Sequence, residues 1–240
     1  MASVIASGDR VIADNFARVR ERIERAAHGR DVTLVCVTKY VGEREAAALV
    51  RAGATDLGEN RVFEGAEKFA AIKREGLAFT SHMIGPVQSN KAKRIPYAFD
   101  WCQSLSREKI ARLIQEACKE HETSLDATIE VNIGREEQKD GVMPESLGSL
   151  VKFVLYECPL VRLRGLMCIP PLATEDATRD YFAQTRNLFD KIGAEFRSSL
   201  PAWDTLSMGM SADFEAAIEE GSTMVRIGSE LYRGLQGFMH

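Results

Sequence analysis

TLVCVTKYVGEREAAALVRAG, residues 33–53, contains the unit from which the fold can be read. Its first part, 33–39, is a short apolar run rich in β-branched residues, which is too brief for a helix and is typical of a buried strand. The charged, alanine-rich part that follows, 43–52, is predicted to be a helix that ends at Gly53. The segment therefore predicts one strand followed by one helix.

The same order of an apolar run and a helical pattern recurs along the rest of the chain. The segments that we interpret as strands are 33–39, 54–58, 78–84, 98–103, 126–133, 161–169, 203–207 and 223–227. The helical segments are 43–52, 61–75, a short one from Gln88, 106–121, 144–156, 175–197, 211–220 and a last turn from Ser229. Apolar residues at three- and four-residue spacings also predict an amphipathic helix over 9–27, before the first strand.

Eight strand-helix units in this order predict parallel pairing and a closed (β/α)8 barrel, an α/β fold with an extra N-terminal helix. An open doubly wound sheet is the alternative, but no G-x-G-x-x-G turn follows the first strand. No low-complexity linker divides the chain, so we expect a single domain over residues 1–240.

The composition excludes several classes of function. The 240 residues are 45% apolar, and 31 basic against 35 acidic residues give a formal charge of -4 without a long block of like charge, which argues against a nucleic-acid partner. No uncharged stretch approaches the ~20 residues that span a bilayer, so we expect no membrane contact. The five cysteines are widely spaced and lack a C-x-x-C pair, which predicts reduced, mostly buried thiols, no metal site and a cytoplasmic location.

Polar residues gather at the predicted C-terminal ends of the strands, where barrels of this kind place their working site. Lys39 ends the first predicted strand and shares a face with Val35 and Val37. With valines beneath it, the amine is expected to be partly desolvated, which lowers its pKa and favours the neutral, nucleophilic form. A strand-end lysine that extends into solvent is the plainer alternative.

The loops after strands seven and eight predict an anion site. Barrels frequently bind phosphate there through backbone N–H groups. Ser211 and Ser229 offer hydroxyls, and Gly228 allows a close approach of the backbone. Taken alone, Ser211 is better explained as the N-cap of helix 211–220.

Arg226 precedes Gly228 by two residues. Its side chain is expected to project into the open C-terminal end of the barrel, the mouth, where these loops lie. Its guanidinium can pair with a phosphate, a carboxylate or a heterocyclic nitrogen. A salt bridge to Glu59 or Glu130 is an equally good explanation, because buried arginines usually need a carboxylate.

His82, Asn60 and Met208 are weaker signals. A single histidine on a strand is more often a hydrogen-bonded core residue than a catalyst. An asparagine after glycine and glutamate can simply shape a turn, and a methionine at the rim is more often packing.

The assembled residues lie in nine segments, of which the last two are highly specific in combination. These are VCVTK (35–39), LGEN (57–60), HMIGPVQSNK (82–91), FDWCQSL (99–105), VNI (131–133), KDG (139–141), LRGLMCIP (163–170), LSMGMSADFEAAI (206–218) and GSTMVRIGSELY (221–232). Together they resemble the pyridoxal phosphate homeostasis protein family, which has the alanine-racemase N-terminal barrel fold, over nearly the whole chain. Thr38 and Tyr40, which flank the lysine, and Ser229, where the family often has threonine, depart from its usual pattern.

The resemblance implies that the protein holds pyridoxal 5'-phosphate (PLP) as an internal aldimine on Lys39. It also implies that Ser211, Gly228 and Ser229 hold the phosphate and that Arg226 faces the pyridine nitrogen. The full set of cofactor contacts that we expect is Lys39, Asn60, His82, Ile84, Met208, Ser211, Arg226, Gly228 and Ser229.

An arginine at the ring nitrogen disfavours ring protonation and weakens PLP as an electron sink. The chain also ends soon after strand eight, without the second domain that racemases with the related barrel use. We therefore expect a PLP carrier that buffers or delivers the cofactor, affects amino-acid metabolism, meets apo PLP enzymes transiently and is a monomer. The alternatives are a small PLP enzyme, such as a weak racemase or lyase, and a cofactor-free barrel with aldolase-type chemistry on Lys39.

Overall fold

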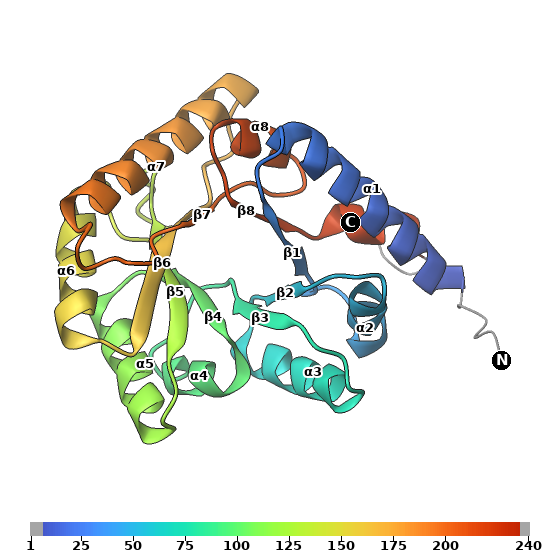
Figure 1. Ribbon diagram of the computed structural model, residues 1–240, viewed down its shortest axis with the longest axis horizontal. Helices are drawn as coiled ribbons and strands as arrows, with labels where there is room; N and C mark the ends of the chain where they lie inside the picture. The colour runs from blue at the N-terminus through green and yellow to red at the C-terminus, as the bar shows by residue number, and fades with distance from the viewer. Residues whose placement is uncertain (1–6, 236–240) are drawn as a thin grey trace.

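The computed structural model describes residues 7–235 and is a closed barrel of eight parallel strands in chain order, enclosed by helices (Figure 1). The strands are β1 (Thr33–Val37), β2 (Asp56–Glu59), β3 (Thr80–Met83), β4 (Trp101–Leu105), β5 (Leu125–Val131), β6 (Val161–Cys168), β7 (Thr205–Ser207) and β8 (Met224–Ile227). The barrel closes because β1 pairs with both β2 and β8. The predicted (β/α)8 fold is therefore confirmed, whereas residues 1–6 and 236–240 of the predicted single domain lie outside the described residues.

The helices follow the predicted order. The α-helices are α1 (Ser7–Ala27), α2 (Glu43–Arg51), α3 (Val62–Arg74), α4 (Ile95–Ala98), α5 (Glu108–Glu120), α6 (Leu147–Glu157), α7 (Glu175–Glu195) and α8 (Phe214–Glu219). The 3-10 turns are η1 (Ala92–Arg94), η2 (Pro144–Ser146) and η3 (Ser229–Tyr232). Among residues 7–235, no helix is both long and apolar enough to cross a bilayer.

Several predicted boundaries differ from the structure, and three of them bear on the loops at the strand ends. The first strand ends at Val37, and residues 39–40 form a turn. The helix expected from Gln88 begins only at η1 and continues into α4, whose first turn holds a proline that needs no N–H partner there. The helix expected over 211–220 begins at Phe214, because Asp213 Oδ1 accepts the Met210 N–H at 2.6 Å and holds a turn before it.

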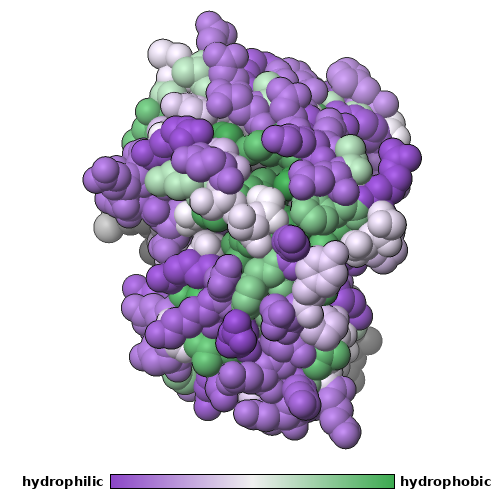
Figure 2. All heavy atoms as spheres, turned by 90° about the vertical axis from the view of Figure 1, so that its left-hand side faces the viewer, coloured by the Kyte–Doolittle hydropathy of each residue, from purple (hydrophilic) through white to green (hydrophobic). Residues whose placement is uncertain are grey.

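The predicted leading helix is α1, which packs against α2, α8 and η3 (Figure 1). Its buried face consists of Ile12, Phe16, Val19 and Ile23, at the predicted spacings. The outer surface is mainly hydrophilic on the face that Figure 2 shows, with hydrophobic residues visible across its middle. All five cysteines are free and buried in the protein core, as predicted.

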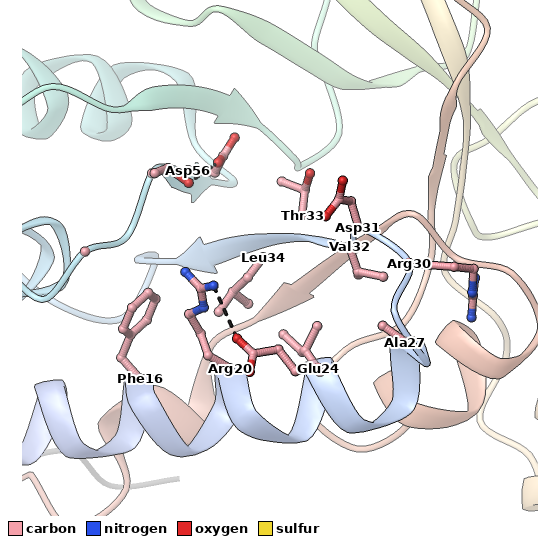
Figure 3. Close-up of a pocket in the computed structure, with 13 residues that line it drawn as sticks. Phe16, Arg20, Glu24, Ala27, Arg30, Asp31, Val32, Thr33, Leu34 and Asp56 are labelled. Atoms are coloured by element: carbon pink, nitrogen blue, oxygen red, sulfur yellow. Dashed lines mark hydrogen bonds and ion pairs between the residues drawn. The ribbon is translucent and has the colours of Figure 1, made fainter.

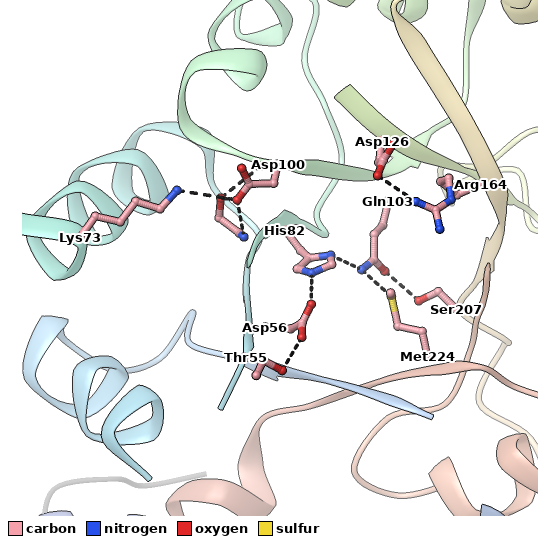
Figure 4. A network of polar contacts seen from close by, with 11 residues as sticks. Thr55, Asp56, Lys73, His82, Asp100, Gln103, Asp126, Arg164, Ser207 and Met224 are labelled. Carbon is pink, nitrogen blue, oxygen red and sulfur yellow. Dashed lines mark hydrogen bonds and ion pairs between the residues drawn. The ribbon is translucent and has the colours of Figure 1, made fainter. Parts of the chain in front are cut away.

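The interior of the barrel is partly polar. Gln103 of β4 bonds to Ser207 of β7, a strand that does not neighbour β4, so both side chains point inward (Figure 4). Arg226 bonds to the same serine. Val35 is paired in register with Arg226 and therefore also faces inward, which confirms the valine-lined face of β1.

Candidate functional site

The turn that carries Lys39 is fixed by hydrogen bonds to its backbone. Lys68 Nζ donates to the Thr38 carbonyl at 2.7 Å, and the Tyr232 hydroxyl donates to the Val37 carbonyl at 3.0 Å. The Thr38 N–H donates to the Gly58 carbonyl at 2.9 Å. The backbone before Lys39 is thus attached to α3, η3 and β2.

The Lys39 side chain itself lies at the mouth of the barrel. It is exposed, and its Nζ is 4.7 Å from the centre of the Tyr40 ring. The expected desolvation by Val35 and Val37 was therefore wrong for this conformation, because the strand ends two residues earlier. The Lys39 amine is therefore accessible to a small molecule that enters the mouth of the barrel.

The loops after β7 and β8 meet at the same end of the barrel. The Gly228 N–H points to Ser211 Oγ at 3.4 Å. Gly228 also lies against β1, since a Cβ built on it would be 3.4 Å from Val37 Cβ. Gly209 lets the β7 loop turn, with φ +96 and Ala217 Cβ only 2.6 Å from the position a Cβ would take.

Ser211 is not a helix cap. The helix α8 begins three residues after it, and no side chain caps that helix. Its half-buried hydroxyl instead accepts a bond from the neighbouring loop, in which Ser229 is also half-buried. The capping explanation is therefore wrong, and the two loops form one polar surface beside the Lys39 turn.

Arg226 is buried at this end of the barrel and is held by neutral groups. Its Nη1 donates to the Ser207 carbonyl at 2.9 Å and to Ser207 Oγ at 2.6 Å, and its Nη2 donates to the Cys168 carbonyl at 2.9 Å. Within the described chain Arg226 forms no ion pair, and the alternative of a salt bridge to Glu59 or Glu130 is wrong. Burial lowers the pKa of its guanidinium, which nevertheless stays charged at neutral pH.

Glu130 is a titratable group beside Arg226. Its strand neighbours Ile129 and Val131 pack in the hydrophobic core, so Glu130 faces the barrel interior. Burial raises the pKa of the Glu130 carboxyl from 4.5 to about 7, although the positive charge of Arg226 opposes the shift. This carboxyl can hold or release a proton near neutral pH.

The raised pKa of Glu130 predicts that the protein becomes less stable as the pH rises from 4.5 to about 7. In this window the folded state binds more protons than the unfolded state, so deprotonation favours unfolding by roughly 2–3 kcal/mol. Urea unfolding of the wild type and of Glu130→Gln, measured across the window, checks this. The variant is expected to lose that fall, and two parallel pH profiles would contradict the shift.

Of the remaining predicted residues, two lie in the loops after β2 and β3 and two are fully buried. Asn60 follows β2 and lies against Gly85, where a Cβ would be 2.4 Å from the Asn60 carbonyl oxygen. Ile84 packs above Gly58. Met208 is fully buried in the core cluster, and His82 is fully buried inside the barrel, bonded to other side chains.

Several functional neighbours were missed by the reasoning from sequence. Lys68 and Tyr232 hold the Lys39 turn, and Gln103 and Ser207 lie beneath Arg226. The signal that could have found Lys68 is Glu59, because a carboxylate at the end of a buried strand needs a cation. The others depend on contacts between residues far apart in the sequence.

A separate cavity of about 290 Å³ lies at the opposite end of the barrel, where β1 and β2 begin (Figure 3). Phe16, Arg20 and Glu24 of α1 line one side of it, and Asp56 lines another. None of the nine predicted contact residues borders this cavity, so it is distinct from the mouth.

Comparisons with known proteins show what this chain is similar to. The family described as alanine racemase, N-terminal domain, matches residues 10–236. The pyridoxal phosphate homeostasis protein of Pseudomonas aeruginosa is 41% identical over 228 residues, which cover 92% of this chain and 94% of that protein. That of Aquifex aeolicus is 40% identical over 225 residues and covers 91% of this chain and 96% of that protein. The structure of PipY from Synechococcus elongatus with PLP bound is 29% identical, with a TM-score of 0.80 over 92% of this chain and 99% of that one.

Proposed function

The chain belongs to the pyridoxal phosphate homeostasis protein family, and from this premise we propose that it binds PLP at the mouth of the barrel, covalently on Lys39. The observation that carries this proposal is the meeting of three elements at one end of the barrel. An exposed lysine follows β1, a polar surface joins the β7 and β8 loops, and a buried arginine lies on β8.

The residues present fit the cofactor. The phosphate needs hydrogen-bond donors, which the Ser211 and Ser229 hydroxyls and the backbone of their loops supply. The pyridine nitrogen needs a donor when it is unprotonated, and Arg226 is bound only by neutral acceptors. Asn60 and Ile84 border the mouth from the β2 and β3 loops.

When bound, PLP supplies an aldehyde that condenses reversibly with a primary amine. Lys39 provides that amine, and the attached carbonyls of Val37 and Thr38 keep its backbone in place. Arg226 would hold a positive charge near the ring nitrogen and would so oppose protonation there. Glu130 can accept or return a proton at its carboxylate near neutral pH.

Titration of the purified protein with PLP tests the proposal. We expect a visible absorption band at one equivalent, and borohydride reduction followed by peptide mass analysis is expected to place the added mass on Lys39. Pyridoxal, which lacks the phosphate, serves as the control ligand and is expected to bind much more weakly. Protein that stays colourless, or that is labelled equally on many surface lysines, would overturn the proposal.

The proposed role is that of a carrier in PLP homeostasis rather than an enzyme. A cation beside the ring nitrogen weakens the electron withdrawal on which carbanion chemistry depends, and Arg226 supplies that cation. Incubation with a panel of L-amino acids, followed by chiral analysis, separates the roles. Turnover of any of them at a rate well above that of free PLP would favour a racemase or lyase.

We further propose that residues 1–240 act as one domain and as a cytoplasmic monomer that passes PLP to apo enzymes. The exposure of Lys39 supports transfer, and five buried free cysteines suit a reducing compartment. Faster activation of an apo PLP enzyme by the loaded protein than by free PLP at equal concentration would support direct transfer. Equal rates would contradict it, and sedimentation would test the monomer.

Ser211→Ala is expected to weaken PLP binding about tenfold to a hundredfold while the fold stays intact. The variant removes one hydroxyl from a charged phosphate, for which a loss of roughly 1.5–3 kcal/mol is typical. Because Ser211 caps no helix, the unfolding free energy is expected to change little. Absorbance titration measures the affinity, with Ser211→Thr as the control that keeps a hydroxyl. Equal affinities for the alanine variant and the wild type would remove Ser211 from the phosphate site.

A further inference from the structure

A continuous chain of hydrogen bonds runs through the barrel from Arg226 to the opposite end. Arg226 Nη1 is 2.6 Å from Ser207 Oγ, which is 2.7 Å from Gln103 Oε1. Gln103 Nε2 is 3.0 Å from His82 Nδ1, and His82 Nε2 is 2.9 Å from Asp56 Oδ1. Figure 4 shows the part from Ser207 to Asp56.

The members of this chain come from five strands, and its three central residues are fully buried. Ser207, Gln103 and His82 each have no solvent-exposed surface. Asp56 borders the 290 Å³ cavity where β1 and β2 begin, while Arg226 lies beside the proposed cofactor site. The hydrogen-bond chain therefore connects Arg226 at one end with Asp56 at the other through three buried side chains.

The donor and acceptor in each hydrogen bond can be assigned by starting from Arg226. Arg226 can only donate, so Ser207 Oγ accepts from it and is free to donate its own hydrogen to Gln103 Oε1. The Gln103 amide nitrogen then faces His82 Nδ1, which must accept. His82 is consequently left with its hydrogen on Nε2, which donates to the Asp56 carboxylate.

A second contact agrees with this orientation of Gln103. Its Nε2 also lies 3.1 Å from Met224 Sδ, which is an acceptor and has no hydrogen to donate. The two amide hydrogens thus have one acceptor each. If the amide were reversed, its oxygen would face the sulfur and its nitrogen would face Ser207, leaving buried groups unsatisfied.

We propose that Ser207, Gln103 and His82 are positioning residues that set the direction of the Arg226 guanidinium, with His82 locked as its neutral Nε2–H tautomer by Asp56. This inference rests on the proposed function, because it assigns Arg226 to the ring nitrogen of PLP. It gives His82 a role beneath the site rather than in contact with the cofactor. Without the chain, Ser207 can rotate and Arg226 loses its shortest bond.

Ser207→Ala tests the chain at its link to Arg226. The variant is expected to keep PLP on Lys39, as borohydride trapping would show, while the absorption spectrum of the bound cofactor and its pH titration shift and the affinity falls about threefold to tenfold. Ser207→Thr, which keeps the hydroxyl, is expected to restore the wild-type spectrum. Ser222→Ala is the matched control, because Ser222 is equally buried but its single hydroxyl hydrogen faces only backbone carbonyls, those of Leu206, Met208 and Met224.

Nitrogen NMR of the cofactor-free protein tests the other end of the chain without PLP. The His82 ring is expected to show a protonated Nε2 and an unprotonated Nδ1 across neutral pH, and Gln103→Met is expected to shift the Nδ1 signal. A His82 imidazolium or an Nδ1–H tautomer would overturn the inference, even if Ser207→Ala failed to fold. A Ser207→Ala spectrum identical to that of Ser222→Ala would also overturn it. Failure of the wild type to bind PLP would instead count against the proposed function.

Discussion

Lys39→Ala is expected to abolish covalent capture of PLP. Lys39 carries the exposed amine of the turn after β1, whereas the Lys68 amine that contacts this turn is held by the Thr38 carbonyl and the Glu59 carboxylate. An aldehyde can form a stable link only with a primary amine that it can reach. Borohydride treatment of the variant in the presence of one equivalent of PLP is expected to leave no added mass on any single peptide. The visible band of the bound cofactor is expected to disappear with it.

The control for this experiment is another lysine far from the mouth. Lys93 is exposed and pairs with Glu116 at 3.0 Å, so Lys93→Ala changes the number of lysines without touching the site. This variant is expected to retain the wild-type adduct. If Lys39→Ala still carried one equivalent of PLP after reduction, the attachment site would lie elsewhere.

The fold could be predicted because its signal is local and repeated. Strand-like segments alternate with segments of helical periodicity along the chain, so the eight units can be counted without knowledge of their contacts. The inward face of β1 also followed from simple alternation, which placed Val35 and Val37 together. Closure of the barrel then follows from the number of units.

The ends of the elements were less predictable. Lys39 continues the alternation of β1 in the sequence, yet the strand ends at Val37. This is the last residue of β1 that is paired with β2, and the Tyr232 hydroxyl donates to its carbonyl. That hydrogen bond comes from a residue 195 positions away. Sequence patterns do not contain such a contact.

The polar interior was missed for a similar reason. Gln103 and Ser207 are ordinary polar residues in their own strands, and alternation can place each of them inward. Their pairing depends on the stagger of the strands around the closed barrel, which decides that β4 reaches β7 at this level. The role of His82 depends on the same stagger.

Lys68→Met is expected to destabilise the protein by about 3–5 kcal/mol, because it leaves the buried Glu59 carboxylate without its cation. Lys68 Nζ lies 2.5 Å from Glu59 Oε1, and the Glu59 side chain is 2% exposed. The same amine donates to the Thr38 carbonyl, so the variant also releases one of the attachments of the Lys39 turn. Thermal unfolding is expected to shift down by roughly 6–20 °C, and PLP capture by the folded fraction is expected to slow.

Two further variants separate the buried charge from the loss of a lysine. Lys73→Met removes a lysine from the same helix, but its side chain is 46% exposed and its ion pair with Asp100 is long, at 3.7 Å, so a loss of about 0.5 kcal/mol or less is expected. Adding Glu59→Gln to Lys68→Met removes the unpaired charge and is expected to recover a large part of the lost stability. Equal losses for Lys68→Met and Lys73→Met, or no recovery in the double variant, would mean that the Glu59–Lys68 pair does not hold the turn. The stability of the barrel and the reactivity of Lys39 are coupled through this pair, because Glu59 also accepts the Thr38 hydroxyl at 2.7 Å, next to the lysine.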